Sequence, residues 1–186
     1  MPSRKISAHE AQANFMDLIS RLGPGGESLV IDVPGTRGLA ILPAELLEAY
    51  EETIEILSDP TLLERVRAGD FALQSGSFIA QKDFETEFGM DVAKTGTRPW
   101  RLVVSNTART ALRSLPRETS RAQVIEFVAG PLLDNPTHVG VELAADLARH
   151  FSAHIVDQRV VYRLDTTQKI VRLIDVHLWE HRYLTR

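Results

Sequence analysis

The sequence predicts an α+β protein of 186 residues that is built from two unlike halves. Helical and strand patterns alternate along the first half, whereas the second half has two helices followed by three consecutive strands. The halves also differ in charge. Residues 1–97 carry 8 Lys and Arg against 16 Asp and Glu, a net charge of −8, and residues 98–186 carry 13 against 9, a net charge of +4. Because opposite charges attract, one half is suited to cover the other.

The composition excludes several classes of protein. Hydrophobic residues make up 44% and charged residues 25%, as in ordinary globular proteins. The absence of cysteine excludes a disulfide framework, a cysteine-ligated zinc site and a thiol nucleophile. No apolar run approaches the roughly 20 residues of a membrane helix, and the polar N-terminus does not look like a signal peptide. We therefore expect a soluble, cytoplasmic protein with no membrane partner.

The sequence pattern of the first half predicts three helices and two short strands. Residues 6–22 carry apolar side chains at helical spacing, and Ser7 followed by Glu10 forms a capping box near their start. The other predicted elements are a hairpin of two strands and then two helices, at residues 28–33, 39–42, 43–57 and 61–68.

Residues 69–98 contain four glycines, as a linker would, but also four of the seven phenylalanines. A solvated spacer should be polar. We therefore expect this segment to lie along another surface, anchored by its phenylalanines Phe71, Phe78, Phe84 and Phe88. The predicted organisation is a first domain over 1–68, a wrapping segment over 69–98 and a second domain over 99–186.

The residue pattern of the second domain predicts the order β-α-α-β-β-β, which is typical of an α+β unit with a mostly antiparallel sheet. The strands are expected at residues 99–104, 149–156, 159–164 and 170–176, with the two helices between the first and second of them.

The first half resembles the Phd/YefM-type antitoxins over about residues 4–70. The matching motifs are Ile6-Ser7, Glu10-Ala11, Asn14-Phe15, Leu29–Ile31, Ala40–Leu42 and, most specifically, Tyr50–Thr53 with Ile56–Pro60. The resemblance implies an α/β antitoxin domain that dimerises, binds operator DNA and represses its own operon. The residues that would contact DNA are Arg4, Lys5, Ser7, His9 and Arg37.

The second half resembles RelE/ParE-type toxins, of the RelE kind, over about residues 99–186. The matching motifs are Trp100–Val104, Thr107–Leu112, Gly130–Pro136, Arg159–Asp165 and the terminal Tyr183. The resemblance implies an endonuclease that cleaves mRNA in the ribosomal A site without a metal or other cofactor. In its reaction the ribose 2′-hydroxyl attacks the neighbouring phosphate, so a proton acceptor and cations are needed.

The toxin resemblance also implies site residues. Arg159 matches an arginine that stabilises the phosphate, and Tyr183 matches a tyrosine that stacks on a base or assists proton transfer. Positions where the family often has Lys or Arg hold other residues here. Histidine titrates near neutrality and could replace those cations. The histidine candidates are His154, His177 and His181, and the further RNA-binding candidates are Arg163, Arg182 and Trp179.

The main hypothesis is a fused toxin–antitoxin protein in which the first half neutralises a latent nuclease. Its expected partners are a second copy of the chain, operator DNA and, for the freed toxin half, the ribosome with its mRNA. One alternative is a DNA-binding repressor or assembly protein with a decayed toxin-like domain, as the missing cations suggest. Another is a ParE-like inhibitor of gyrase, against which Arg159 and Tyr183 argue.

Overall fold

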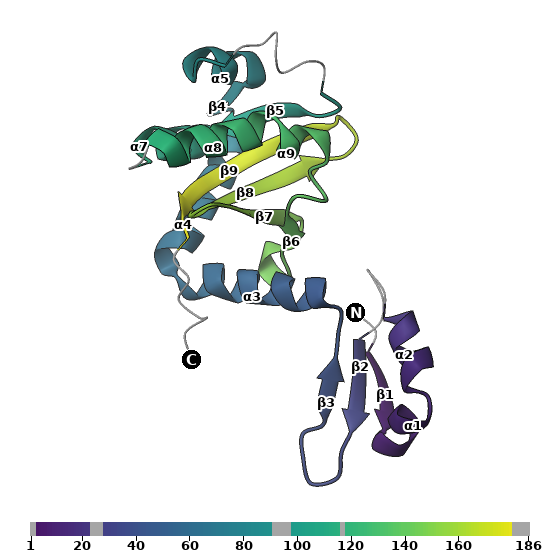
Figure 1. The fold of residues 1–186 in the computed structure, drawn as a ribbon. Coiled ribbons are helices and arrows are strands. Elements are labelled where there is room, and N and C mark those ends of the chain that lie inside the picture. The colour runs from purple at the N-terminus through teal and green to yellow at the C-terminus, as the bar shows by residue number, and fades with distance from the viewer. Residues whose placement is uncertain (1–2, 23–27, 91–97, 116–117, 180–186) are drawn as a thin grey trace. The chain divides into compact units, whose positions relative to one another are not determined.

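The computed structural model describes residues 3–22, 28–90, 98–115 and 118–179. The chain divides into two compact units, the N-terminal unit Met1–Glu51 and the C-terminal unit Glu52–Arg186 (Figure 1). The division falls inside helix α3 (Ala44–Ser58), upstream of the boundary expected at residue 68. The last turns of α3 and all of the following helix therefore belong to the C-terminal unit.

The N-terminal unit contains a three-stranded sheet and two short helices. Its strand order is β1-β2-β3, with β1 parallel to β2 and β2 antiparallel to β3. The elements are β1 (Ser3–Ser7), α1 (Ala8–Ala13), α2 (Phe15–Arg21), β2 (Ser28–Asp32) and β3 (Leu39–Ile41). A small core joins helices and sheet, formed by Ile6, Ala11, Leu18, Leu29 and Ile31.

The single helix expected over 6–22 is wrong at its start and in its middle. Ser7 is the N-cap, as its side-chain oxygen accepts a hydrogen bond from the Glu10 backbone N–H at 3.1 Å. An N-cap has extended backbone, so Ile6 before it is free to pair with β2 as a strand residue. Asn14 then interrupts the helical run, which leaves two helices in place of one.

The C-terminal unit contains a six-stranded sheet in the order β4-β5-β9-β8-β7-β6. Among the strand pairs of the described residues, only β5–β9 is parallel, which confirms the mostly antiparallel α+β expectation. The strands are β4 (Phe78–Ala80), β5 (Arg101–Ser105), β6 (Val141–Glu142), β7 (His150–Ile155), β8 (Gln158–Asp165) and β9 (Ile170–Leu178). The helices are α4 (Pro60–Gln74), α5 (Gln81–Glu87), α7 (Asn106–Ser114), α8 (Glu118–Ala129), α9 (Pro131–Asp134) and the short 3-10 helix η1 (Ala145–Leu147).

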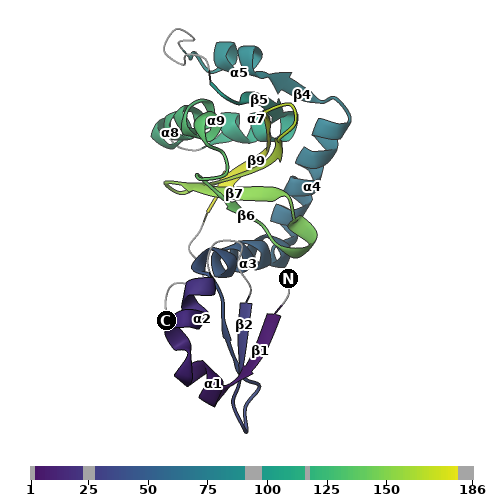
Figure 2. The ribbon, with the colours of Figure 1, turned by 90° about the vertical axis from the view of Figure 1, so that its right-hand side faces the viewer.

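This sheet has helices on both faces (Figure 2). Each face has its own apolar core. The larger core lies under α5, α7, α8 and α9, and the smaller one lies under α3 and α4. Val160 belongs to the larger core and Val161 to the smaller one, because successive side chains of a strand point to opposite faces. Residues 52–74 of α3 and α4, which we call the covering segment, therefore close one face of the sheet.

The phenylalanine anchors expected over 69–98 do not act as a group. Phe71 is 70% exposed and Phe78 is 40% exposed, so neither anchors the chain to another surface. Phe84 is fully buried and Phe88 packs against it, but both belong to the larger core. The segment is thus an integral part of the C-terminal unit, because β4 pairs with β5 and α5 covers the sheet. Residues 91–97 lie outside the described residues.

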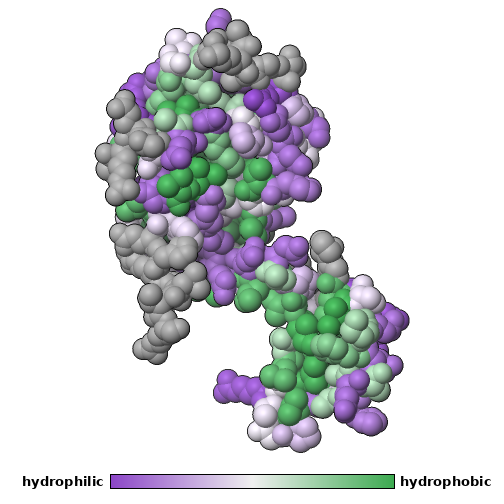
Figure 3. Space-filling view, viewed as in Figure 1, coloured by the Kyte–Doolittle hydropathy of each residue, from purple (hydrophilic) through white to green (hydrophobic). Residues whose placement is uncertain are grey.

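Large apolar side chains remain exposed on the N-terminal unit. Figure 3 shows the apolar surface of this unit in green. They are Phe15, Met16, Ile19, Leu39, Leu47 and Tyr50. Such a concentration on a small unit is typical of a surface that contacts another protein. Among the described helices of both units, none has the length and hydrophobicity needed to span a bilayer.

Candidate functional site

Three of the candidate site residues lie side by side on one face of the large sheet. His154 on β7 is directly opposite Arg159 on β8, and Arg159 is directly opposite His177 on β9. Opposed residues of neighbouring strands point to the same face. The turn between β7 and β8 has only two residues, which fixes this register. The sequence candidates from three separate strands are thereby brought together on the face that the covering segment closes.

Arg159 is the centre of this group and is fully buried, although it carries a charge. Its Nε lies 3.1 Å from a Glu52 carboxylate oxygen, and its Nη2 donates a hydrogen bond to Glu55. Both acids come from the last turns of α3, where a spacing of three residues places them on one side of the helix. A buried guanidinium without such partners would be strongly destabilising. The two carboxylates therefore make the burial of Arg159 tolerable.

The same two acids hold the neighbouring polar groups. Glu52 is hydrogen-bonded by the Ser152 hydroxyl at 2.7 Å and contacts His154 Nε2 at 2.6 Å. The indole N–H of Trp179 donates to Glu55 at 3.3 Å, and its ring centroid lies 4.0 Å from that of His154. Ser152, His154, Arg159 and Trp179 are therefore all connected to acids of α3.

A second group of contacts joins α4 to the same face. Asp70 lies 2.7 Å from His150 Nε2 and 3.4 Å from Arg163 Nη1. His150 on β7 is directly opposite Arg163 on β8, so one carboxylate bridges two adjacent strands. Arg163, expected to bind RNA, is thus paired with an acid of the covering segment.

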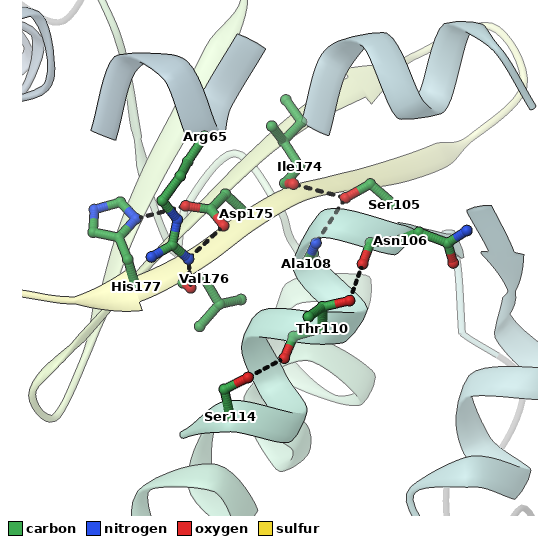
Figure 4. A network of polar contacts seen from close by, with 10 residues as sticks. All are labelled: Arg65, Ser105, Asn106, Ala108, Thr110, Ser114, Ile174, Asp175, Val176 and His177. Atoms are coloured by element: carbon green, nitrogen blue, oxygen red, sulfur yellow. Dashed lines mark hydrogen bonds and ion pairs between the residues drawn. The ribbon is translucent and has the colours of Figure 1, made fainter. Parts of the chain in front are cut away.

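A third contact runs the other way, from a base on α4 to an acid on the sheet (Figure 4). Arg65 donates to the buried Asp175 carboxylate at 2.8 Å and to the Val176 carbonyl oxygen at 2.7 Å. The other oxygen of Asp175 lies 3.0 Å from His177 Nδ1. Asp175 therefore orients the His177 ring while Arg65 holds Asp175.

Three carboxyl groups at these contacts have pKa values below their ordinary range. Burial acts to raise the pKa of Glu52, but hydrogen bonds from His154 and Ser152 and the charge of Arg159 outweigh it. Burial also acts to raise the pKa of Asp70, but the hydrogen bonds and charges of His150 and Arg163 outweigh it and lower the pKa. The pKa of Asp175 is lowered in the same way by His177 and Arg65.

We expect the free energy of unfolding to fall as the pH drops below about 4.5. A carboxyl group with a lowered folded pKa stabilises the fold above its unfolded pKa, and this stability is lost as the pH falls through the folded pKa. Urea unfolding between pH 7 and pH 3 should show a shallower pH dependence for Asp70→Asn than for the parent. Asp146→Asn, at an exposed position, is the control and should leave the pH dependence unchanged. An identical dependence in Asp70→Asn and the parent would contradict this assignment.

Gly69 lets α4 approach the sheet closely. A Cβ at this position would overlap the Ile174 carbonyl oxygen of β9, which is backbone and cannot rotate away. Alanine normally stabilises a helix interior by about 1 kcal/mol relative to glycine. At this site we expect Gly69→Ala to cost about 1–3 kcal/mol instead, through overpacking. Urea unfolding measures the sign, with Ala68→Ser at the exposed neighbour as control. Stabilisation by Gly69→Ala would show that α4 does not pack as described.

The remaining sequence candidates are dispersed or undescribed. His181, Arg182 and Tyr183 lie outside the described residues. The DNA candidates lie in the N-terminal unit, where Arg4 pairs with Glu10 at 3.0 Å, Lys5 approaches Asp32 at 4.0 Å and Ser7 caps α1. His9 is exposed on α1, and Arg37 is exposed in the turn between β2 and β3. Among the described residues, no group of three or more acids and histidines is placed to hold a metal ion.

The sequence interpretation missed the partners that cover the site, above all Glu52, Glu55 and Asp70. A signal was available in α3, where Glu55 and Ile56 follow Glu52 by three and four residues and so lie on its side of the expected helix. Acids beside an apolar position indicate a helix face that docks on a basic surface. No comparable pattern marks Asp70, because its partners His150 and Arg163 lie 80 and 93 residues away in the sequence.

Comparison with known proteins finds toxins. Toxin RelE of Mycobacterium tuberculosis H37Rv is 38% identical over 78 residues, which are 42% of this chain and 79% of that toxin. Toxin RelG of the same organism is 36% identical over 84 residues, which are 45% of this chain and 92% of that toxin. A chain of the toxin–antitoxin complex RelBE2 from M. tuberculosis is 35% identical, with 43% of this chain and 98% of that chain covered and a TM-score of 0.41. No family model matches the chain.

Proposed function

Because this chain belongs to the RelE family of toxins, we propose that its C-terminal unit is a latent mRNA endonuclease. We propose further that the covering segment, residues 52–74, neutralises it within the same chain. The observation that carries this proposal is the fully buried Arg159, held by Glu52 and Glu55 of α3. A phosphate-binding arginine that is already paired with two carboxylates has no access to RNA.

The proposed reaction is an attack of a ribose 2′-oxygen on the adjacent phosphorus, with departure of the 5′-oxygen. A base must accept the 2′-proton, a cation must offset the charge of the phosphorane, and an acid must protonate the leaving oxygen. Arg159 is the proposed cation and His154, directly opposite it, a proposed proton carrier. His177 on the other side of Arg159 is the second candidate for proton transfer. Tyr183, His181 and Arg182 complete the proposed site as expected from the sequence.

The pairing with carboxylates supports inhibition by charge mimicry. Glu52 contacts both His154 and Arg159, the two groups that the reaction would need free. A carboxylate that occupies the phosphate position also repels an incoming RNA phosphate. Because the inhibitor is part of the same chain, its effective concentration is high, and modest contacts suffice to keep the face closed.

We propose an antitoxin role for the N-terminal unit, with dimerisation through its exposed apolar residues and binding to operator DNA. The exposed side chains of Phe15, Met16 and Leu39 favour a protein contact there. DNA binding would use Arg4, Lys5 and Arg37, of which Arg37 lies in an exposed turn. The competing proposal, a repressor with a decayed toxin, is favoured by Ser152 on the covered face where the family often has a base.

The test is to separate the two parts at the exposed turn Ser75–Gly76, between α4 and β4. We expect residues 75–186 expressed alone to arrest translation in cells, and residues 1–74 supplied in trans to restore it. Arg159→Ala in the fragment should abolish the arrest. Absence of any effect from a folded, soluble 75–186 fragment would favour the decayed toxin.

A further inference from the structure

A pocket of about 340 Å³ lies beside the C-terminal part of α4 and the turn between β8 and β9. Two arginines, Arg163 on β8 and Arg172 on β9, line it directly opposite one another. Their side chains are 35% and 34% exposed, so both guanidinium groups remain accessible. The turn adds the hydroxyl-bearing residues Thr166 and Thr167 to the lining.

Two like charges directly opposed on a sheet are unfavourable unless an anion lies between them. The pocket contains two acids, which differ in origin. Asp165 accepts a hydrogen bond from the Gln168 backbone N–H at 3.0 Å and lies 3.3 Å from Arg172. Its contacts therefore stabilise the turn between β8 and β9, to which it belongs. Asp70 belongs to the covering segment and reaches Arg163 at only 3.4 Å. When α4 is absent, Asp70 is absent too, and two arginines face one carboxylate.

The contacts of Asp70 with Arg163 and His150 have the same pattern as the contacts of Glu52 with Arg159 and His154. In both places a carboxylate of the covering segment meets an arginine of β8 and a histidine of β7. Arg159 and Arg163 are four residues apart on one strand, which corresponds to about 13 Å at the usual rise. The two guanidinium groups hold different carboxylates, Arg159 those of α3 and Arg163 that of Asp70, so they do not converge on one anion. The Arg163 position would therefore receive a different phosphate of the same strand.

We propose that Arg163 and Arg172 form a second anion subsite, which binds a backbone phosphate of single-stranded RNA next to the cleaved bond. Asp70 occupies this subsite in the covered chain as a phosphate mimic. His150, which Asp70 also contacts, is the third group that becomes available to the phosphate. The RNA assignment rests on the proposed function, whereas the anion subsite depends only on the pocket and its charges.

The first experiment uses the full-length chain and inorganic phosphate. Asp70→Asn removes the charge but keeps the shape, and we expect it to raise phosphate affinity by about tenfold, as one charge-assisted contact does. Titration calorimetry or NMR shifts of the arginine side chains measure this. Adding Arg163→Gln and Arg172→Gln should remove the gain, whereas Arg101→Gln on the exposed part of β5 should not. No gain in Asp70→Asn, or a gain that survives without both arginines, overturns the subsite.

The second experiment separates RNA from free phosphate. Full-length Glu52→Gln/Glu55→Gln/Asp70→Asn is titrated with a short single-stranded RNA whose 2′-hydroxyls are methylated, so that no cleavage can occur. We expect the slope of log affinity against log salt to fall by about 0.7 for each arginine of the pair that is removed. An unchanged slope, with phosphate still bound, overturns the RNA assignment. Because neither readout needs catalysis, an inactive nuclease would leave both results interpretable.

Discussion

We expect the full-length chain with Glu52→Gln and Glu55→Gln to arrest translation in cells, and the parent chain to leave translation unchanged. Both substitutions keep the size of the side chain and remove its charge. Arg159 would then be a buried cation without an anion, and breaking such a pair by removing its partner costs about 3–5 kcal/mol. The covering segment can avoid this cost by leaving the sheet, which would expose the face that carries Arg159 and His154.

The matched control changes the same number of charges on the same helix. Glu48 and Glu51 are exposed on α3, and Glu48→Gln with Glu51→Gln should leave the chain as harmless as the parent. Incorporation of labelled amino acids after induction measures translation, and circular dichroism of the purified variants checks that they fold. A folded Glu52→Gln/Glu55→Gln chain that leaves translation unchanged would contradict neutralisation through Arg159.

A third variant separates release from loss of stability. Adding Arg159→Met to Glu52→Gln/Glu55→Gln replaces the buried cation by an apolar side chain of similar volume, which is often neutral or stabilising. We expect this triple variant to regain stability and to lose toxicity. Toxicity that persists in the triple variant would show that Arg159 takes no part in RNA cleavage.

The sequence was sufficient for four of the strands from residue 99 onward and the two long helices between the first two of them, because each carries its own local pattern. The short strands β4 and β6 were not predicted. The charge difference between the halves predicted that the first covers the second. Of that first half, residues 52–74 pack on the large sheet, within the C-terminal unit. The first helix was expected to begin at residue 6 although Ser7 was its expected N-cap. An N-cap precedes the helix, so Ile6 lies in a strand. A capping residue decides such a boundary more strongly than one apolar position does.

The covering contacts could not be located from the sequence because they depend on register across three strands. Glu52 meets Ser152, His154 and Arg159 only because a two-residue turn sets His154 opposite Arg159. Phenylalanine content pointed instead to residues 69–98. An aromatic residue is equally suited to its own domain core and to a partner surface, so composition alone could not distinguish the two.

Phe84→Ala is expected to lower the free energy of unfolding by about 3–5 kcal/mol, the usual cost of truncating a buried phenylalanine. Phe84 is fully buried in the larger core, in the same cluster as Trp100, whereas Phe71 is 70% exposed on α4. Phe71→Ala should therefore stay within about 0.5 kcal/mol of the parent. Urea unfolding followed by tryptophan fluorescence measures both, and a larger loss in Phe71→Ala than in Phe84→Ala would restore Phe71 as an anchor.

The same residue determines how much of the chain a free toxin needs. A fragment that begins at residue 98 lacks Phe84 and the β4 strand, which pairs with β5, and would expose the larger core. We expect residues 98–186 to aggregate and residues 75–186 to remain soluble, as judged by size-exclusion chromatography. A soluble, folded 98–186 fragment would show that β4 and α5 belong to the inhibitor rather than to the toxin fold.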